Sequence, residues 1–199
     1  MKLFSTKIKE LILATESKTR IEILEKYKLN FKVKKHSVDE GKVKRKYSYL
    51  PPRELVVKLA KEKAYSFKDI KNIIVIAADQ ILVINNSILS KAKTFKEAKR
   101  NLNLLQNKKH RLISAIYIIK RGKFYWCCVK EAVIEMRKLA SYEINSYLKN
   151  NKQIYLTTVG GYQIENDILN CLKVEKGDEE TIKGFPIKNI IPFLKKEIL

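Results

Sequence analysis

The chain has 199 residues, of which 45% are hydrophobic, and its formal net charge is +21. This length and apolar content supply a real core, which argues against a disordered chain and suits one large domain or two small lobes. The charge is typical of a protein that attracts nucleotides, nucleic acid or anionic lipid, but it also fits a chain that carries many solvated lysines.

The apolar runs are too short for a membrane protein. The longest, residues 73–78, stops at Asp79 and falls far below the ~20 residues that a membrane helix needs. Charged residues interrupt the N-terminal apolar segment, which argues against a signal peptide. The three cysteines are an odd number and lack zinc-site spacing. We therefore expect a reduced, cytoplasmic chain without a membrane span or a structural zinc.

The first half of the chain alternates short apolar runs with amphipathic segments. The expected elements are, in chain order, a buried strand at 11–14, a helix at 17–28 with Ser17 as its N-cap, a strand at 31–33, a polar loop at 36–52, and a helix opened by Pro51 and Pro52 with Lys63 near its end.

The second half is richer in long strands. The expected elements are a hairpin at 72–91 that turns at Asn85-Asn86, an amphipathic helix at 94–105 capped by Thr94, two antiparallel strands at 110–136 that turn at Arg121-Gly122, a helix at 141–148, and a final helix after a turn at 184–186. Because no repeat or flexible linker is present, this order predicts one domain, residues 1–199, with a mixed sheet and two lobes around a cleft.

Asp79 is the most suggestive single residue. It lies inside the apolar strand run, where an aspartate needs a partner, a cation or a cleft to offset its burial. A strand-end acid on the surface, or one held in a structural ion pair, is the alternative.

Other polar residues carry weaker signals, each with an ordinary structural alternative. Lys63 and Lys91 could meet an anion or be solvated, and Glu40 in the Asp-Glu-Gly stretch could bind Mg²⁺ or Mn²⁺ or lie in a turn. Glu165 could accept hydrogen bonds from a purine or be a surface acid. His36 and His110 have no partner at metal-ligand or triad spacing, so no role is assigned to them.

Motifs spread over nearly the whole chain resemble the Maf family of septum-formation-associated nucleotide pyrophosphatases. The matching segments are Leu-Ile-Leu-Ala-Thr-Glu-Ser-Lys-Thr-Arg at 11–20, Asp-Glu at 39–40, Leu-Ala-Lys-Glu-Lys-Ala at 59–64, Ala-Ala-Asp-Gln at 77–80, Lys91, Glu97-Ala98 through Leu105, and Gly-Phe-Pro at 184–186.

The resemblance implies an α/β fold with a mixed, largely antiparallel, elongated sheet flanked by helices, as in inosine-triphosphate pyrophosphatases. It implies hydrolysis of nucleoside triphosphates to the monophosphate and pyrophosphate with a divalent metal, Mg²⁺ or Mn²⁺, by a homodimer. By matching positions, Asp79 is the catalytic acid/base and lies with Glu40 at the metal. The triphosphate is bound by Ser17, Arg20, Lys63 and Lys91.

Three positions bear on the nucleobase. Gln80 and Glu165 resemble the branch of the family that acts on 7-methyl-GTP, whereas Thr19 stands where that branch carries Trp. The set is closer to members assigned as general nucleoside triphosphate pyrophosphatases, with a 7-methyl-GTP enzyme as the alternative. A nucleotide-binding regulator without turnover and a nucleic-acid-binding module are alternatives from other classes, although no basic, aromatic-rich binding motif is found.

Overall fold

The computed structural model describes residues 8–198 of the chain. Its first elements are β1 (Glu10–Ala14), α1 (Lys18–Glu25), β2 (Lys32–Lys34), α2 (Glu40–Lys46), α3 (Pro52–Tyr65), β3 (Ile73–Ile84), β4 (Ser87–Leu89), α4 (Phe95–Leu105) and β5 (Lys108–Lys120). The remaining elements are β6 (Lys123–Met136), α5 (Ser141–Asn150), α6 (Lys152–Thr157), the 3-10 helix η1 (Ile164–Asn166), β7 (Leu172–Lys176), α7 (Glu179–Ile182), the 3-10 helix η2 (Lys188–Ile190) and α8 (Ile191–Ile198).

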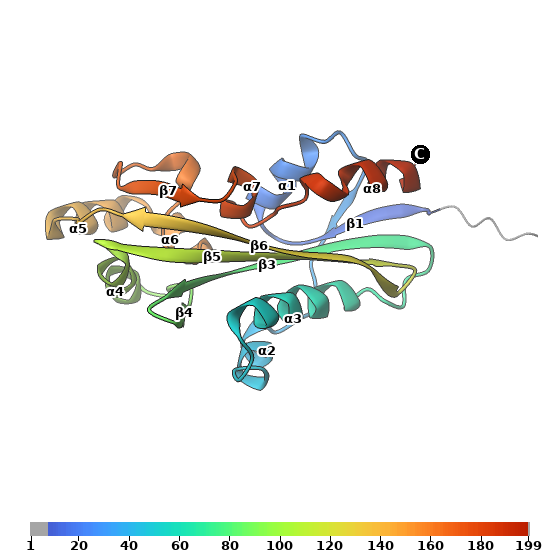
Figure 1. Ribbon diagram of the computed structural model, residues 1–199, viewed down its shortest axis with the longest axis horizontal. Helices are drawn as coiled ribbons and strands as arrows, with labels where there is room; N and C mark the ends of the chain where they lie inside the picture. The colour runs from blue at the N-terminus through green and yellow to red at the C-terminus, as the bar shows by residue number, and fades with distance from the viewer. Residues whose placement is uncertain (1–7, 199) are drawn as a thin grey trace, which may run out of the picture. The chain divides into compact units, whose positions relative to one another are not determined.

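The strands form one mixed sheet of seven strands in the order β2-β1-β3-β5-β6-β7, with β4 paired to β3 (Figure 1). β1 runs parallel to both β2 and β3, whereas β4 is antiparallel to β3 and β7 is antiparallel to β6. The predicted α/β fold with a mixed sheet flanked by helices is therefore confirmed. In the described residues, no helix is both long and apolar enough to cross a membrane.

The chain divides into two compact units. The first contains the described residues up to Asp79, Ser114–Val129 and the residues from Gly184 onward, and the second contains Gln80–Ile113 and Lys130–Lys183. The predicted single domain with two lobes around a cleft stays a prediction.

The core of the first unit follows from the alternation of strand side chains. On one face of the sheet, alternate residues of β1, β3 and β5 pack against α1 and α8. Members of this cluster include Leu11, Leu13, Ile74, Ile76, Leu24 and Leu194. The other face is covered by α3, whose Leu55, Val56 and Leu59 are buried (Figure 1). Burying a Leu, Ile or Val side chain stabilises the fold by ~1.5–3 kcal/mol.

The second unit holds its own core beneath α4, α5 and α6. Leu102 of α4, Leu148 of α5 and Tyr155 of α6 belong to one buried cluster with strand residues such as Ile134. The predicted cap of α4 is confirmed, because Thr94 Oγ1 accepts a hydrogen bond from Glu97 N at 3.2 Å.

Both predicted two-residue turns are present. Asn85 and Asn86 have φ of 48° and 59°, and Arg121 and Gly122 have φ of 53° and 74°. Two consecutive positive φ values are those of the turn that matches the twist of an antiparallel hairpin. At Gly122 a Cβ would also lie 2.7 Å from the Lys68 carbonyl oxygen, so a side chain has no room there.

The predicted loop at 36–52 is wrong in part, because residues 40–46 form α2. Asp39 Oδ1 accepts a hydrogen bond from Lys42 N at 3.0 Å and caps this helix, while basic residues in its last turn favour the helix dipole. The short elements α6, β7 and α7 were also not predicted, because their few residues carry little periodicity.

Candidate active site

Asp79 lies where the parallel part of the sheet ends. Ala14, the last residue of β1, pairs with Ala77, so Asp79 is two residues beyond that register. Ala78 packs into the core shared with α1 and α8, and successive strand side chains point to opposite faces. Asp79 therefore points to the face covered by α3. The residue is only 6% exposed. It lies just beyond the level of the carboxyl end of β1, and ligand sites in α/β sheets are found at the carboxyl ends of parallel strands.

Lys63 is the partner that Asp79 needs. On α3, Lys63 follows Leu59 by four residues and Val56 by seven, which puts it on the buried face of the helix. Its Nζ lies 3.2 Å from Oδ1 of Asp79 and 2.7 Å from Oε1 of Glu40, and its side chain is 3% exposed. The solvated alternative for Lys63 is therefore wrong. We call these three residues the Glu40–Lys63–Asp79 cluster.

Glu40 reaches the cluster as the first residue of α2. The Asp39 cap fixes the start of this helix, and hydrogen bonding to the Lys42 backbone lowers the pKa of Asp39. Glu40 and Asp79 thus come from different elements and are bridged by one ammonium group. The turn alternative for Glu40 is wrong, since the residue is helical and paired.

The second carboxylate oxygen of Asp79 is the most informative atom of the site. Oδ2 is buried and has no hydrogen-bond partner among the described residues. An unpaired buried acceptor costs ~1–3 kcal/mol, so it is suited to meet a water or a cation. In residues 8–198 no group of three or more His, Cys, Asp or Glu side chains is placed to hold a metal. Two carboxylates nevertheless fit Mg²⁺ or Mn²⁺, which takes one or two carboxylates and completes its shell with phosphates and water.

Arg20 is tied to two backbone carbonyls. Its Nε donates to Gly184 O at 3.1 Å and its Nη1 donates to Ala78 O at 2.8 Å. Desolvation lowers the pKa of the guanidinium, and the charges of Asp79 and Glu40 oppose that shift. These two bonds use two of the five N–H donors of an arginine, which leaves others for an anion. Arg20 therefore joins β3 to the turn before α8 and lies next to Asp79 in the chain fold.

The start of α1 differs in detail from the prediction. Ser17 occupies the N-cap position, as predicted, but its side chain makes no capping hydrogen bond. Its N–H instead donates to Oγ1 of the buried Thr15 at 3.1 Å. Thr19 lies in the first turn of the helix and is half-buried. The Ser17 hydroxyl is thus not engaged as a cap.

His36 is a residue that sequence reasoning left without a role. It follows β2 by two residues, and the charges of Lys63, Glu40, Glu16 and Asp79 all act on its ring. Burial, followed by the charge of Lys63, lowers the pKa of His36. The available signal was its place just after a strand and shortly before Glu40, because the carboxyl ends of parallel strands share one edge of a sheet.

The remaining predicted residues belong to the second unit. Gln80 Nε2 donates to Thr181 O at 3.1 Å and to Ile182 O at 2.9 Å, so this amide holds α7. Lys91 is exposed shortly after β4, and Glu165 is exposed on η1. Their predicted roles toward a nucleotide stay predictions.

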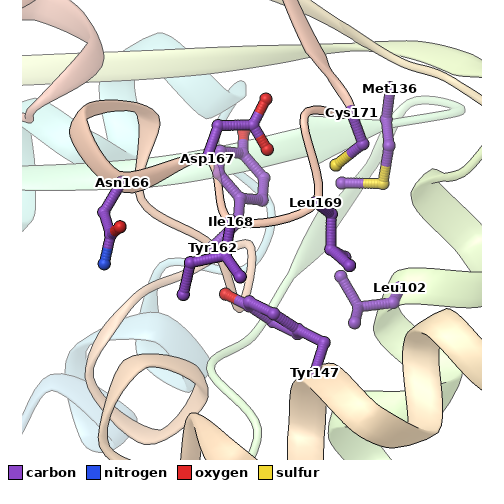
Figure 2. Close-up of a pocket in the computed structure, with 9 residues that line it drawn as sticks. All are labelled: Leu102, Met136, Tyr147, Tyr162, Asn166, Asp167, Ile168, Leu169 and Cys171. Atoms are coloured by element: carbon purple, nitrogen blue, oxygen red, sulfur yellow. The ribbon is translucent and has the colours of Figure 1, made fainter.

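A small pocket within the second unit contains none of the predicted residues (Figure 2). Tyr162 and Cys171 are among its lining residues. The Tyr162 hydroxyl is 2.5 Å from His110 Nε2, and burial raises the pKa of Cys171 to about 12. A thiol with a raised pKa is a poor nucleophile, so Cys171 does not supply an activated nucleophile to this pocket.

The chain is similar to known proteins over nearly its whole length. The sequence model of the family described as "Maf-like protein" matches residues 10–197. The chain is 34% identical over 193 residues to a nucleoside triphosphate pyrophosphatase of Pelagibacter ubique, which covers 94% of this chain and 98% of the relative. It is 35% identical over 187 residues to a 7-methyl-GTP pyrophosphatase of Bartonella henselae, with 94% and 93% covered.

A HAM1 protein from Coxiella burnetii superposes with a TM-score of 0.49 and 13% identity over 94% of this chain and 98% of that chain. The family assignment rests on the sequence relatives alone. The mixed sheet and the buried charged cluster at the end of its parallel part define an α/β protein with a polar site at that place. The chain belongs to the Maf family.

Proposed function

We propose that this protein is a nucleoside triphosphate pyrophosphatase that releases the nucleoside monophosphate and pyrophosphate. The observation that carries the proposal is the unpartnered Oδ2 of Asp79 beside an ammonium group at the parallel end of the sheet. The names of the relatives, which are nucleoside triphosphate and 7-methyl-GTP pyrophosphatases, support the same reaction class.

The proposed chemistry divides between the two oxygens of Asp79. Lys63 holds Oδ1, which fixes the carboxylate, while Oδ2 accepts a proton from the water that attacks the phosphorus. Arg20 offers its remaining donors to phosphate oxygens, where a guanidinium can bind bidentately. Lys63 contributes a point charge, and the Ser17 hydroxyl at the start of α1 contributes a hydrogen bond near a helix N-terminus.

The charge balance favours a divalent cation. Glu40 and Asp79 together cancel the formal charges of Lys63 and Arg20, so these residues alone do not neutralise a triphosphate. Glu40 and Asp79 would hold Mg²⁺ or Mn²⁺ through hard oxygen ligands. When bound, the metal would supply charge neutralisation on the phosphates and lower the pKa of a bound water.

Base selectivity belongs to the same proposal. Thr19, Gln80 and Glu165 are proposed to decide between general nucleoside triphosphates and 7-methyl-GTP, and Lys91 is proposed to contact the phosphates. Relatives of both kinds are similar to the chain to nearly the same degree. The homodimer and the cytoplasmic location stay predictions.

A pyrophosphate-release assay tests the function. The protein should release pyrophosphate from a panel of canonical triphosphates and 7-methyl-GTP with Mg²⁺ or Mn²⁺, and a chelator should stop the release. Asp79→Asn should lose on the order of 10²-fold or more in kcat, because it removes the proton acceptor. Asp69→Asn removes an exposed carboxylate and is the matched control. An Asp79→Asn protein as active as the wild type would overturn the assignment, and nucleotide binding without release by the wild type would identify a regulator.

A further inference from the structure

His36 lies close to the Glu40–Lys63–Asp79 cluster, because the charges of all three residues act on its ring. The end of β2 is joined to the segment after β1, because Thr15 N donates to Lys34 O at 3.1 Å. The neighbouring side chains are also paired, with Lys35 Nζ 2.9 Å from Glu16 Oε1. His36 therefore follows a segment, residues 34–35, that is bonded to Thr15 and Glu16, the two residues just before Ser17 and α1.

The ring of His36 has an unmet hydrogen-bonding group. Its Nδ1 is shielded from water and has no hydrogen-bond partner among residues 8–198. The ring as a whole is half-buried, so a turn about the Cβ–Cγ bond exchanges its shielded side and its open side. Because an unsatisfied buried nitrogen is costly, a ligand atom that accepted a hydrogen bond from Nδ1 would bind with a gain.

The surroundings of the ring disfavour its protonated form. Burial and the positive charge of Lys63 lower the pKa of His36, and the carboxylates of Glu40, Glu16 and Asp79 oppose the shift without reversing it. A neutral imidazole carries one donor and one acceptor nitrogen. Since phosphate oxygens only accept, Nδ1 must be the protonated nitrogen in a contact with phosphate.

His36 is not assigned to the metal. Among the described residues, His36 does not form a three-residue group with Glu40 and Asp79 that could hold a metal. We propose that His36 is a substrate-binding residue, which donates a hydrogen bond from Nδ1 to a phosphate oxygen of the bound nucleotide. This proposal rests on the proposed pyrophosphatase function.

Three substitutions test the donor. Asn places an amide N–H near the position of Nδ1, Gln places one near Nε2, and Leu has no donor. We expect His36→Asn to keep KM within about threefold of the wild type, and His36→Leu and His36→Gln to raise KM about tenfold or more with little change in kcat, since a hydrogen bond to a charged group is lost. Ser37→Leu, at an exposed neighbour, should leave KM unchanged.

Binding and thermal unfolding separate the possible outcomes. The Kd for a non-hydrolysable triphosphate should follow the same order as KM, while the melting temperatures of the Asn and Gln variants should match. Equal affinity in the Leu and Asn variants would overturn the proposal, as would a common loss of kcat and melting temperature in the Asn and Gln variants. If the wild type binds the analogue but hydrolyses no nucleotide, the pyrophosphatase function fails while the binding order still decides the role of His36.

Discussion

The Nζ of Lys63 lies 3.2 Å from Oδ1 of Asp79, and both side chains are almost fully shielded from water. The contact joins α3 to the part of β3 that belongs to the first unit, so the ion pair that shapes the site also stabilises that unit. Removing one partner of a buried pair leaves an uncompensated charge, which costs far more than losing a surface ion pair. We therefore expect the Lys63–Asp79 contact to affect both the activity and the stability of the protein.

Lys63→Met should lower both the stability and the pyrophosphate release of the protein. It leaves the carboxylates of Asp79 and Glu40 without their shared cation, so we expect a loss of about 3–5 kcal/mol in the free energy of unfolding and of about 10²-fold in pyrophosphate release. Urea unfolding and the release assay measure these effects.

A double variant isolates the pair. In the Lys63→Met background, Asp79→Asn should destabilise less than in the wild type by about 0.5–3 kcal/mol, because the stranded charge is then gone. Lys68→Met, on an exposed lysine, should be neutral. Additive effects of the two substitutions would show that the contact contributes nothing.

Arg20→Lys should test both roles of this side chain, which are holding the Gly184 and Ala78 carbonyls and binding phosphate. A lysine cannot span the carbonyls of Gly184 and Ala78 while also facing phosphate, because it lacks the planar fork. We expect a loss of about 2 kcal/mol in unfolding free energy and a fall of about tenfold to 10²-fold in kcat/KM. Arg100→Lys, at an exposed site, is the control. Unchanged kcat/KM in a destabilised Arg20→Lys protein would limit Arg20 to a structural role.

Stability measurements test whether Gln80 anchors α7, independently of its proposed role in base selectivity. Its amide donates to the carbonyls of Thr181 and Ile182, so Gln80→Glu would place a carboxylate against two acceptors. We expect Gln80→Glu to destabilise the protein by about 2–3 kcal/mol and Gln80→Ala by about 1–2 kcal/mol. Gln153→Glu, on an exposed glutamine, should stay within about 0.5 kcal/mol of the wild type in urea unfolding. Equal stability of the Glu and Ala variants would contradict the anchor role.

Acid stability should depend on His110. Burial lowers the pKa of His110 from 6.5 to about 4, so the unfolded chain takes up a proton more readily than the folded protein. The folded state is therefore unaffected by this group above pH 6.5 and loses stability as the pH falls from there toward 4. At 1.36 kcal/mol per pH unit the loss approaches about 3 kcal/mol.

His110→Gln is the variant against which the loss of stability at low pH can be measured. The glutamine amide can still meet the Tyr162 hydroxyl, which His110 Nε2 contacts at 2.5 Å, but it does not titrate. Urea unfolding of both proteins between pH 7.5 and pH 4 should show the wild type losing stability relative to the variant. A constant difference over that range would contradict a neutral buried His110.

Features of the fold that depend on residues close together in the sequence could be predicted. The helices around Leu55 and Leu102 follow from apolar spacing, and the turns at Asn85-Asn86 and Arg121-Gly122 follow from residues that tolerate positive φ. α2 was missed, because its cap residue Asp39 stands in a polar run that also suits a loop. Asp79 was found because an acid inside an apolar strand is a local anomaly.

The contacts that make a site of these residues were decided by the tertiary structure. Lys63 and Asp79 are 16 positions apart, and Arg20 and Gly184 are 164 positions apart, so no local pattern relates them. The residue pattern singled out Asp79 and offered Lys63 as a weaker candidate, and the resemblance assigned Lys63 and Arg20 to the triphosphate. Only the packing of α3 on the sheet revealed that Lys63 is buried between two carboxylates. A role for His36 could not be predicted from the sequence either. Its place near the site depends on the pairing of β1 with β2 and β3, which brings the ends of these parallel strands together.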